Sequence, residues 1–485
     1  MVVPAVRRVP WWRVDQSQWP MGGTMQERAV KTVVDAVALV EASALTHIKV
    51  GLSDIDGVMR GKYLRKDKFL SALKSGLGFC NVVLGWDLDD HLYDNVKYTG
   101  WHTAYPDAQV RIVPESCRRL PLEPGPGGEA MLFFLAEFEG AAAQVCPRRL
   151  LHRVLERADS LGFDAYGALE YEFFMFTETP QSVREKGYRN LQNWTPGNFG
   201  YSVLRSTVAS DFYRQLNEMC EAMDMPIEGL HTETGPGVLE AALAVDQVAR
   251  AADKGFLFKT FTKALAQRNG MMATFMAKWS HEHPGQSGHI HLSLRDKQTN
   301  KSAFFDESQP YGMSRTQARF MAGVQRYLPE FMAMYAQTVN SYSRLVPGYW
   351  APLDATWGME NRTTALRLIP GSDTSQRVEV RIGSADANPY LALAAALGSG
   401  LYGIERELEP EPMVQGNAYA QQFPAHLKLP NTLWDAAQRL RQSDVARTLF
   451  GEAFVEHFAA TREWEEREFR RHVTDWELAR YFEII

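Results

Sequence analysis

The chain has few cysteines, and their spacing excludes two kinds of protein. Its 485 residues include four cysteines, Cys80, Cys117, Cys146 and Cys220, and no two of them form a C-x-x-C pair. This excludes a small disulfide-rich scaffold and a zinc site built on paired cysteines. We expect reduced, buried thiols in a cytoplasmic protein and assign them no chemistry.

The chain also lacks long apolar runs and an excess of positive charge. No run of about 18 or more apolar residues occurs, and the first ~25 residues contain no continuous apolar segment, so we expect neither a membrane span nor a secretion signal. The formal net charge of −6 argues against nucleic acid as a partner, because phosphate binding calls for a basic excess. An anionic substrate would therefore be bound by local basic clusters.

The common nucleotide-binding motifs are missing. Neither the G-x-x-x-x-G-K-[ST] phosphate loop nor the G-x-G-x-x-G dinucleotide fingerprint occurs, and the chain contains no internal repeat. If the protein binds ATP, another architecture must hold it.

Three short stretches that read as β-strands carry charged side chains on one face. They span residues 170–172, 289–293 and 379–381. Successive strand residues point to opposite faces, so the carboxylates, imidazoles and guanidinium lie on one side and the apolar residues on the other. Two charged residues at positions i and i+2 of a single strand more often lie on a solvent-exposed face than in a metal site. Recurrence in three places instead favours a platform for metal ions and anions.

Two further groups extend this chemistry. Glu233 and Glu240 flank a Gly-Pro-Gly turn that can fold both carboxylates toward one point, and hard divalent cations prefer such oxygens. Surface-loop acids are the alternative. The second group is rich in arginine, whose guanidinium binds carboxylates and phosphates through two parallel hydrogen bonds. Its members are Arg344, Arg362, Arg367, Arg377 and Arg381, for which surface salt bridges are the alternative.

The pattern along the chain predicts a small, mostly β domain followed by alternating helices and strands. Residues 47–52 and 131–135 read as strands, and helical periodicity begins after Pro147. Long helices are expected around residues 209–223, 244–269, 314–338 and 388–407, with amphipathic surface helices from residue 431 onward.

These motifs together resemble the glutamine synthetase family, and within it the branch of γ-glutamyl-amine ligases rather than glutamine synthetase proper. The resemblance covers nearly the whole chain from about residue 45, because the motifs occur in the family's order. They are Asp56-Gly57 with Arg60-Gly61-Lys62, Glu170-x-Glu172, residues 233–240, 285–293 and 340–352, Asn361-Arg362, and residues 377–390.

The resemblance implies an α+β fold with a β-grasp N-terminal domain over residues 31–140 and a glutamine-synthetase-type catalytic domain over 147–485, built on an antiparallel half-barrel sheet flanked by helices. Residues 1–30 would form an N-terminal extension that precedes the β-grasp domain. The family assembles as a dodecamer of two hexameric rings, with each active site formed between protomers. Such an enzyme uses ATP and two or more Mg²⁺ or Mn²⁺ ions per site.

The resemblance also implies roles for individual residues. Glu172, Glu233 and Glu240 would bind one metal, and Glu170, His289 and Glu379 another. Glutamate would be bound by Arg344, Arg381 and, at its amino group, Gly285. The nucleotide would meet His291, Ser293 and Arg377, while Arg362 and Arg367 would contact the ATP phosphates and the transition state.

Several positions depart from the family pattern. Trp350 stands where glutamine synthetases proper have a glutamate that closes over the ammonium site, and an aromatic wall suits an amine with a carbon substituent. The aspartate that helps deprotonate the amine corresponds to Asp87, with Asp89 as a competitor. Pro284 replaces an asparagine beside the glutamate site. The surroundings of Tyr419 differ from those of the tyrosine adenylylated in some bacterial members, so we do not expect that regulation.

We therefore expect ATP-dependent ligation of the glutamate γ-carboxylate to a primary amine other than ammonia, through a γ-glutamyl phosphate intermediate. Polyamines, ethanolamine, alkylamines and arylamines all fit. The alternatives are glutamine synthetase itself and a non-catalytic family member, whose signature would be lost metal ligands.

Overall fold

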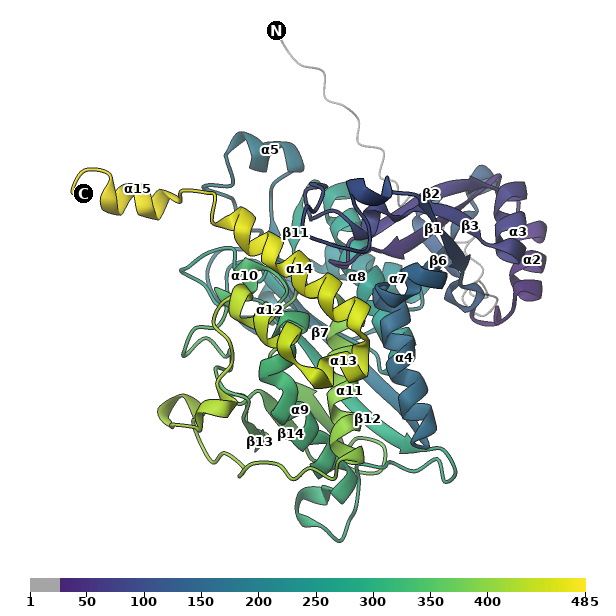
Figure 1. The fold of residues 1–485 in the computed structure, drawn as a ribbon. Helices are drawn as coiled ribbons and strands as arrows, with labels where there is room; N and C mark the ends of the chain where they lie inside the picture. Colours follow the sequence, from purple (N-terminus) through teal and green to yellow (C-terminus); the bar gives the residue numbers. More distant parts are fainter. Residues whose placement is uncertain (1–26) are drawn as a thin grey trace.

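Two β-sheets carry the fold in the computed structural model, which describes residues 27–485 (Figure 1). Most of the expected N-terminal extension lies outside the described residues. The first sheet has six strands, in the order β2-β1-β6-β4-β3 with β5 paired to β6. Its strands are β1 (His47–Ser53), β2 (Met59–Arg65), β3 (Leu77–Cys80), β4 (Asp107–Ile112), β5 (Arg118–Pro124) and β6 (Ala130–Phe138).

The first sheet has its own apolar core, covered by helices α2 (Val33–Ala42) and α3 (Lys66–Ser75). Phe69 of α3 packs on Phe134 of β6, with ring centroids 4.9 Å apart. The stretches predicted as strands at 47–52 and 131–135 lie in β1 and β6, which pair in parallel. Both predictions are confirmed, while the exact limits of the two domains remain a prediction.

The second sheet has nine strands and forms the platform of the larger domain. Its order is β13-β14-β15-β12-β7-β9-β8, with β10 and β11 paired to the long strand β7. The strands are β7 (Phe163–Phe176), β8 (Ile227–Thr232), β9 (Val238–Leu243), β10 (Asp246–Gln247), β11 (Met272–Thr274), β12 (Gly288–Asp296), β13 (Trp357–Met359), β14 (Leu366–Ile369) and β15 (Arg377–Val380). The predicted alternation is confirmed, because Tyr171, Ile290, Leu292, Val378 and Val380 are all buried on the apolar face.

Helices cover that apolar face. The central one is α11, which is buried along most of its length and packs on α9, α4 and α8 (Figure 1). The helices are α4 (Pro147–Ser160), α5 (Pro180–Glu185), α6 (Val203–Val208), α7 (Ser210–Ala222), α8 (Val248–Arg268), α9 (Arg315–Tyr335), α10 (Val339–Tyr342), α11 (Pro389–Glu405), α12 (Leu433–Gln442), α13 (Asp444–Phe450), α14 (Glu452–Phe469) and α15 (Asp475–Tyr481). Thus α7, α8, α9 and α11 confirm the four predicted long helices.

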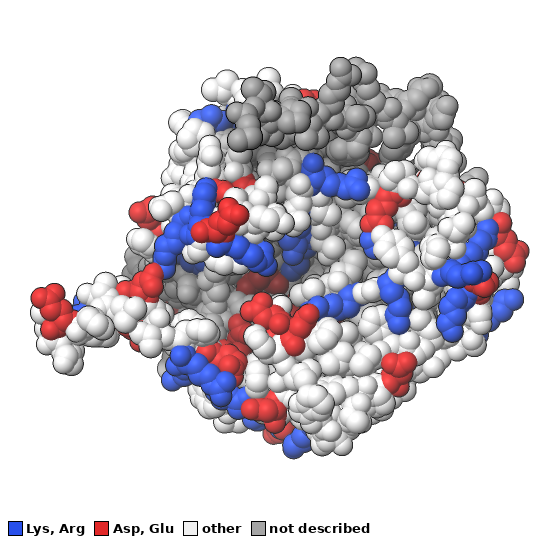
Figure 2. Space-filling view, turned by 90° about the horizontal axis from the view of Figure 1, so that it is seen from above, with Lys and Arg blue, Asp and Glu red and all other residues white. Residues whose placement is uncertain are grey.

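The surface carries charges of both signs. Seen from above, basic and acidic side chains are interspersed, and α15 projects from one edge of the molecule (Figures 1 and 2).

Cys117, Cys146 and Cys220 are buried free thiols as expected, whereas Cys80 is only partly buried. Within residues 27–485, no helix has the length and apolar character that crossing a membrane requires.

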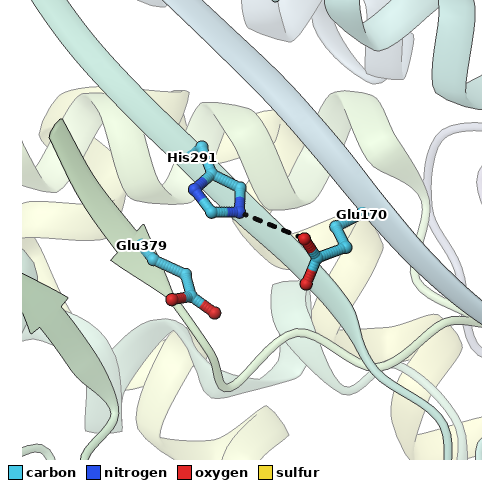
Figure 3. A group of neighbouring side chains, drawn as sticks. All are labelled: Glu170, His291 and Glu379. Atoms are coloured by element: carbon cyan, nitrogen blue, oxygen red, sulfur yellow. Dashed lines mark ion pairs between the residues drawn. The ribbon is translucent and has the colours of Figure 1, made fainter. Parts of the chain in front are cut away.

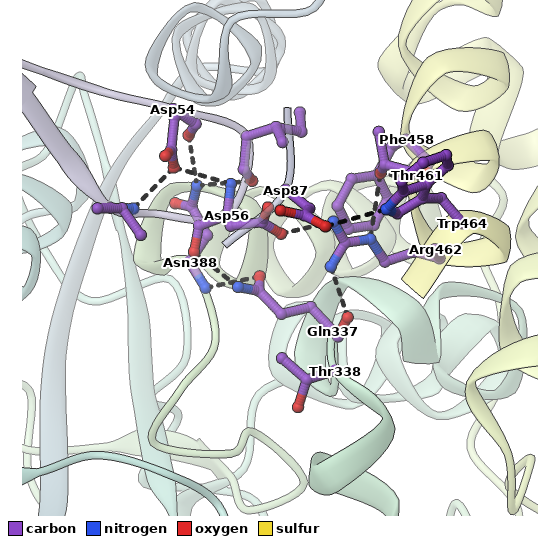
Figure 4. A network of polar contacts seen from close by, with 12 residues as sticks. Asp54, Asp56, Asp87, Gln337, Thr338, Asn388, Phe458, Thr461, Arg462 and Trp464 are labelled. Atoms are coloured by element: carbon purple, nitrogen blue, oxygen red, sulfur yellow. Dashed lines mark hydrogen bonds and ion pairs between the residues drawn. The ribbon is translucent and has the colours of Figure 1, made fainter. Parts of the chain in front are cut away.

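The turn between β1 and β2, residues 54–58, docks into the larger domain and is called the docking turn below (Figure 4). Arg462 of α14 pairs with the Asp56 carboxylate, and both side chains are almost fully buried. Asn388 donates to the carbonyl of Ile55 (3.2 Å), and Gln337 donates to that of Asp56 (2.7 Å). Buried polar contacts therefore fix the first domain on the second.

Candidate active site

Carboxylates and imidazoles from three neighbouring strands meet on the polar face of the second sheet. β12 lies between β7 and β15, in a register that places His289 opposite Glu170 and His291 opposite Glu379. His289 Nδ1 lies 2.9 Å from Glu170 Oε1 and 3.4 Å from Glu379 Oε1. His291 Nε2 lies 3.7 Å from Glu170 Oε2 (Figure 3). The strand alternation thus turns all four side chains toward one point.

A second group lies beside this one, on β8, β9 and the loop between them. Glu240 of β9 is paired in register with Glu172 of β7. His231 Nε2 lies 3.1 Å from Glu240 Oε1, and its Nδ1 lies 4.0 Å from Glu233 Oε1. The loop therefore brings Glu233 and Glu240 around a shared imidazole.

These donor atoms fit divalent metal ions. Three overlapping triads each place three possible ligand atoms within 4.8 Å of one another: Glu170, His291 and Glu379; Glu170, Glu240 and His289; and His231, Glu233 and Glu240. Carboxylate oxygens with imidazole nitrogens suit Mn²⁺, and carboxylate-rich sets suit Mg²⁺. Five of the six expected ligands belong to these triads, and the sixth, Glu172, lies opposite Glu240 but accepts hydrogen bonds from the N–H and Oγ of Ser287 (2.6 and 2.7 Å). The division of the ligands between two ions remains a prediction.

Burial and neighbouring charges set the protonation of these groups. Burial works to raise the pKa of Glu379, but the nearby His289 and Arg381 outweigh it and lower the pKa to about 2. Burial raises the pKa of Glu240 to about 7, with the Glu170 and Glu172 carboxylates adding to the rise. Crowded carboxylates of this kind are stabilised in their ionised form by a bound cation.

Arg367, Arg377 and Arg381 approach the first group of ligands. Arg367 Nη1 lies 2.9 Å from Glu379 Oε2, and Arg381 pairs with the other oxygen of Glu379. Arg377 Nε donates to His291 Nδ1 at 3.4 Å. The expected nucleotide residue Ser293 lies two positions beyond His291 on β12, whereas Arg362 is exposed. Three of the five arginines therefore contact the ligand cluster itself.

Arg344 and Gly285 lie together next to this cluster. The Arg344 guanidinium is 3% exposed and donates to the carbonyls of Arg381, Ile382 and Gly383 at 3.0–3.2 Å. Burial lowers its pKa to about 10. A Cβ at Gly285 would lie 2.5 Å from Arg344 Cγ, so only glycine allows this approach. Two of the three expected glutamate-binding residues, Arg344 and Gly285, are thus in contact.

Two expected residues lie outside the cluster. Trp350 is 56% exposed and has a positive φ of 60°, which is unusual for a large side chain. The Asp87 carboxylate is hydrogen-bonded within its own chain. It accepts from the N–H groups of Asp89 and His91 (both 2.9 Å) and from Trp464 Nε1 (3.1 Å). These contacts favour a structural role for Asp87, and its catalytic role remains a prediction.

Two further residues, His231 and Tyr201, lie in the site without having been expected from the sequence. His231 precedes Glu233 by two positions, so the same strand alternation could have found it. The Tyr201 ring lies 4.5 Å from that of His231, and burial and the Glu233 carboxylate raise the pKa of Tyr201 to about 12. It is held by a hydrogen bond from its N–H to Thr232 O (2.7 Å), for which the sequence carries no signal.

Comparison with known proteins adds independent information. Residues 144–481 match the family described as glutamine synthetase, catalytic domain. The chain is 43% identical over 452 residues to type-1 glutamine synthetase 2 of Dictyostelium discoideum, covering 92% of this chain and 85% of that protein. It is 35% identical over 463 residues to glutamate–isopropylamine ligase of a Pseudomonas species, covering 95% of this chain and 100% of the relative. A solved structure of apo GmaS superposes with a TM-score of 0.79 at 25% identity, covering 92% of this chain and 99% of that one.

Proposed function

The chain belongs to the glutamine synthetase family and is an ATP-dependent amide-forming ligase; on that premise, we propose that it joins the γ-carboxylate of glutamate to a primary amine other than ammonia. The acceptor would be a polyamine, ethanolamine, an alkylamine or an arylamine. The observation that carries this proposal is an intact metal and arginine platform combined with a tryptophan at position 350.

The proposed reaction has two steps. The glutamate γ-carboxylate attacks the γ-phosphorus of ATP, which gives γ-glutamyl phosphate and ADP. The amine nitrogen then attacks the acyl carbon, loses a proton and expels phosphate, which leaves the γ-glutamyl amide. Divalent metals would supply charge neutralisation for the transferring phosphoryl group.

The protein's own residues would bind and orient the reactants. Arg367, which pairs with Glu379 at 2.9 Å and with Glu360, would meet phosphate oxygens that approach the ligand cluster. Arg344 and Gly285, which are in contact, would hold glutamate. We propose that two or more Mg²⁺ or Mn²⁺ ions occupy the polar face, held by Glu170, Glu172, Glu233, Glu240, His289 and Glu379.

Trp350 supports an organic acceptor for an electrostatic reason. An ammonium ion has no carbon surface, so a site that binds it relies on nearby negative charge and hydrogen bonds. The indole ring offers an apolar face that binds carbon substituents and attracts a cation only through its π-system. The Trp350 side chain is 56% exposed and therefore available to a ligand. The likeness to a glutamate–isopropylamine ligase agrees with this choice.

We further propose that the protein acts as a dodecamer of two hexameric rings with active sites shared between protomers, as the family resemblance implies. The Asp87 carboxylate, expected from the resemblance to assist amine deprotonation, accepts three hydrogen bonds within its own chain, and we propose a structural role for it instead. The four free cysteines support a reducing, cytoplasmic setting.

An amine panel tests the proposal. Phosphate release is measured with glutamate, ATP and Mg²⁺ in the presence of ammonium, putrescine, ethanolamine, isopropylamine or aniline, and the product is identified by mass spectrometry. We expect at least one organic amine to exceed ammonium in kcat/KM. A higher kcat/KM for ammonium than for every organic amine would refute the proposed acceptor.

Glutamine synthetase activity is the second candidate, because the Dictyostelium relative, at 43% identity, is a glutamine synthetase by name. The same panel distinguishes the two activities. A non-catalytic role is the remote alternative, and absence of ATP turnover with every amine would favour it.

A further inference from the structure

At the arginine side of the candidate site, two buried polar groups have no hydrogen-bond partner among residues 27–485. They are the hydroxyl oxygen of Tyr419 and the Nε of Arg381. Arg381 is 5% exposed, and its Nη1 is occupied by Glu379. Buried polar groups are nearly always hydrogen-bonded in folded proteins, so two such groups near each other mark a place where a polar ligand binds.

Tyr419 is held in place by its neighbours in the chain. It lies in a short 3₁₀ helix (Ala418–Ala420) that Asn417 caps, accepting from the Tyr419 N–H at 3.0 Å. The N–H of Ala418 donates to Thr363 Oγ1 at 3.0 Å. Arg381 is tied to the same loop, because its N–H donates to Ala365 O at 2.8 Å. One loop, residues 361–365, therefore fixes both Tyr419 and Arg381.

Two cations lie within electrostatic range of the phenol. Burial raises the pKa of Tyr419, and the charges of Arg381 and Arg344 act in the opposite direction. The phenol is therefore protonated near neutral pH and can donate a hydrogen bond. Nη1 and Nη2 of Arg344 donate to backbone carbonyls, whereas the Tyr419 hydroxyl and Arg381 Nε have no partner among the described residues and can each donate to a ligand.

A carboxylate is the ligand that satisfies this pair. Its oxygens accept from both an O–H and an N–H, and its charge is stabilised by the two guanidinium groups. Arg381 is already paired with Glu379, so a neutral ligand would leave the charge of Arg344 without a carboxylate partner among the described residues, and a cation would be repelled by it.

We propose that the hydroxyl of Tyr419 binds a carboxylate of the amino-acid substrate, next to Arg381. This inference rests on the proposed function, which supplies glutamate as that substrate. It adds to the site a residue outside the β-sheet, carried by the loop that follows α11.

Calorimetric binding of glutamate, without an amine acceptor, tests this inference. The holoenzyme with Mg²⁺ and a non-hydrolysable ATP analogue is titrated with glutamate, for the wild type and for Tyr419→Phe, which keeps the ring. Tyr213→Phe is the matched control, because its hydroxyl is also buried without a partner but packs beside Trp194, away from the arginines. We expect Tyr419→Phe to bind glutamate about tenfold more weakly, as expected for one charge-assisted hydrogen bond.

The control should bind glutamate like the wild type, and both variants should bind the ATP analogue unchanged. In turnover assays the KM for glutamate should rise about tenfold with little change in kcat. Unchanged glutamate affinity in Tyr419→Phe, or an equal loss of affinity for the ATP analogue, would overturn the inference. If the wild type itself binds no glutamate, the proposed function fails as well.

Discussion

Removing the charge of Arg462 should destabilise the protein more than any surface substitution, because this residue holds the docking turn. Its guanidinium pairs with Asp56 across the domain boundary and also donates to Gln337 O and Thr461 Oγ1 (Figure 4). The side chains of Arg462 and Asp56 are 2% and 3% exposed. Arg462→Met keeps the aliphatic stem and leaves the Asp56 carboxylate buried without its partner.

The size of the effect follows from this burial. Breaking a buried ion pair by removing one partner destabilises proteins by roughly 3–5 kcal/mol, because the remaining charge is left uncompensated. Unfolding entropy of about 2.1 cal/mol/K per residue gives ~1 kcal/mol/K for a chain of this length, so the melting temperature should fall by about 3–5 °C if the chain unfolds as one unit.

Differential scanning calorimetry with a matched control measures this effect. Arg470→Met removes an arginine near the end of the same helix, where the side chain is 67% exposed and pairs with Glu466. Such a surface pair contributes about 0.5 kcal/mol or less. Adding Asp56→Asn to Arg462→Met should restore part of the loss, because the unpaired charge is then gone. If Arg462→Met melts within 1 °C of Arg470→Met, the reasoning is wrong.

Three further substitutions test the site and its support. Trp350→Glu should raise the kcat/KM ratio of ammonium to the preferred organic amine at least about tenfold, because negative charge replaces an apolar ring. Asp87→Asn should cost about 1–2 kcal/mol of stability and leave kcat with the amine within about twofold, because its carboxylate accepts three hydrogen bonds from its own chain. His457 is buried and donates from Nε2 to Leu84 O (2.8 Å), with Nδ1 unpaired, and burial lowers its pKa to about 4. The imidazole of His457 binds a proton near pH 6.5 in the unfolded chain and only near pH 4 in the folded chain. The free energy of unfolding should therefore fall by about 3 kcal/mol as the pH is lowered from 6.5 to 4.

Each of these has a control and a result that contradicts it. Trp350→Phe keeps an aromatic wall and should retain the preference for organic amines; an unchanged ratio in Trp350→Glu would contradict the role of the indole. A large loss of kcat in Asp87→Asn at unchanged stability would support the catalytic assignment instead. His457→Gln keeps a donor for Leu84 without titrating, so it should lose this part of the pH dependence; an unaltered pH slope would contradict the assignment.

The strand alternation made the ligand cluster predictable from sequence. The direction of the side chains alternates along a strand with a period of two residues. The side chains of Glu170, His289, His291 and Glu379 could therefore be assigned to one face without any knowledge of the sheet order. The antiparallel pairing of β7, β12 and β15 then brings His289 to 2.9 Å from Glu170 and 3.4 Å from Glu379, and His291 to 3.7 Å from Glu170. Local periodicity therefore predicted which side chains share a face, and the order of the strands in the sheet determines which of them meet.

Residues held by contacts distant in sequence could not be predicted in this way. The Asp87 carboxylate meets the indole of Trp464, which lies on the last long helix, 377 positions away. Tyr201 joins the site from a loop in which its φ is 54°, a conformation that no local pattern demands. The Tyr419 hydroxyl reaches the arginines from the segment after α11. In each case tertiary packing determines which residue becomes the partner, and local sequence patterns do not predict this packing.

The docking turn and the arginine platform are physically connected through residues 381–388. This segment begins at Arg381, which contacts Glu379, and ends at Asn388, which donates to the carbonyl of Ile55 in the docking turn. Between these ends, Lys259 donates to the carbonyls of residues 385–387 at 2.7–3.2 Å. A Cβ at Gly57 of the turn would lie 3.0 Å from Asn388 Cα, so a larger residue would push on this segment directly. The Asp-Gly motif near the start of the chain thus supports the position of Arg381, the proposed glutamate-binding arginine, which lies more than three hundred residues later in the sequence.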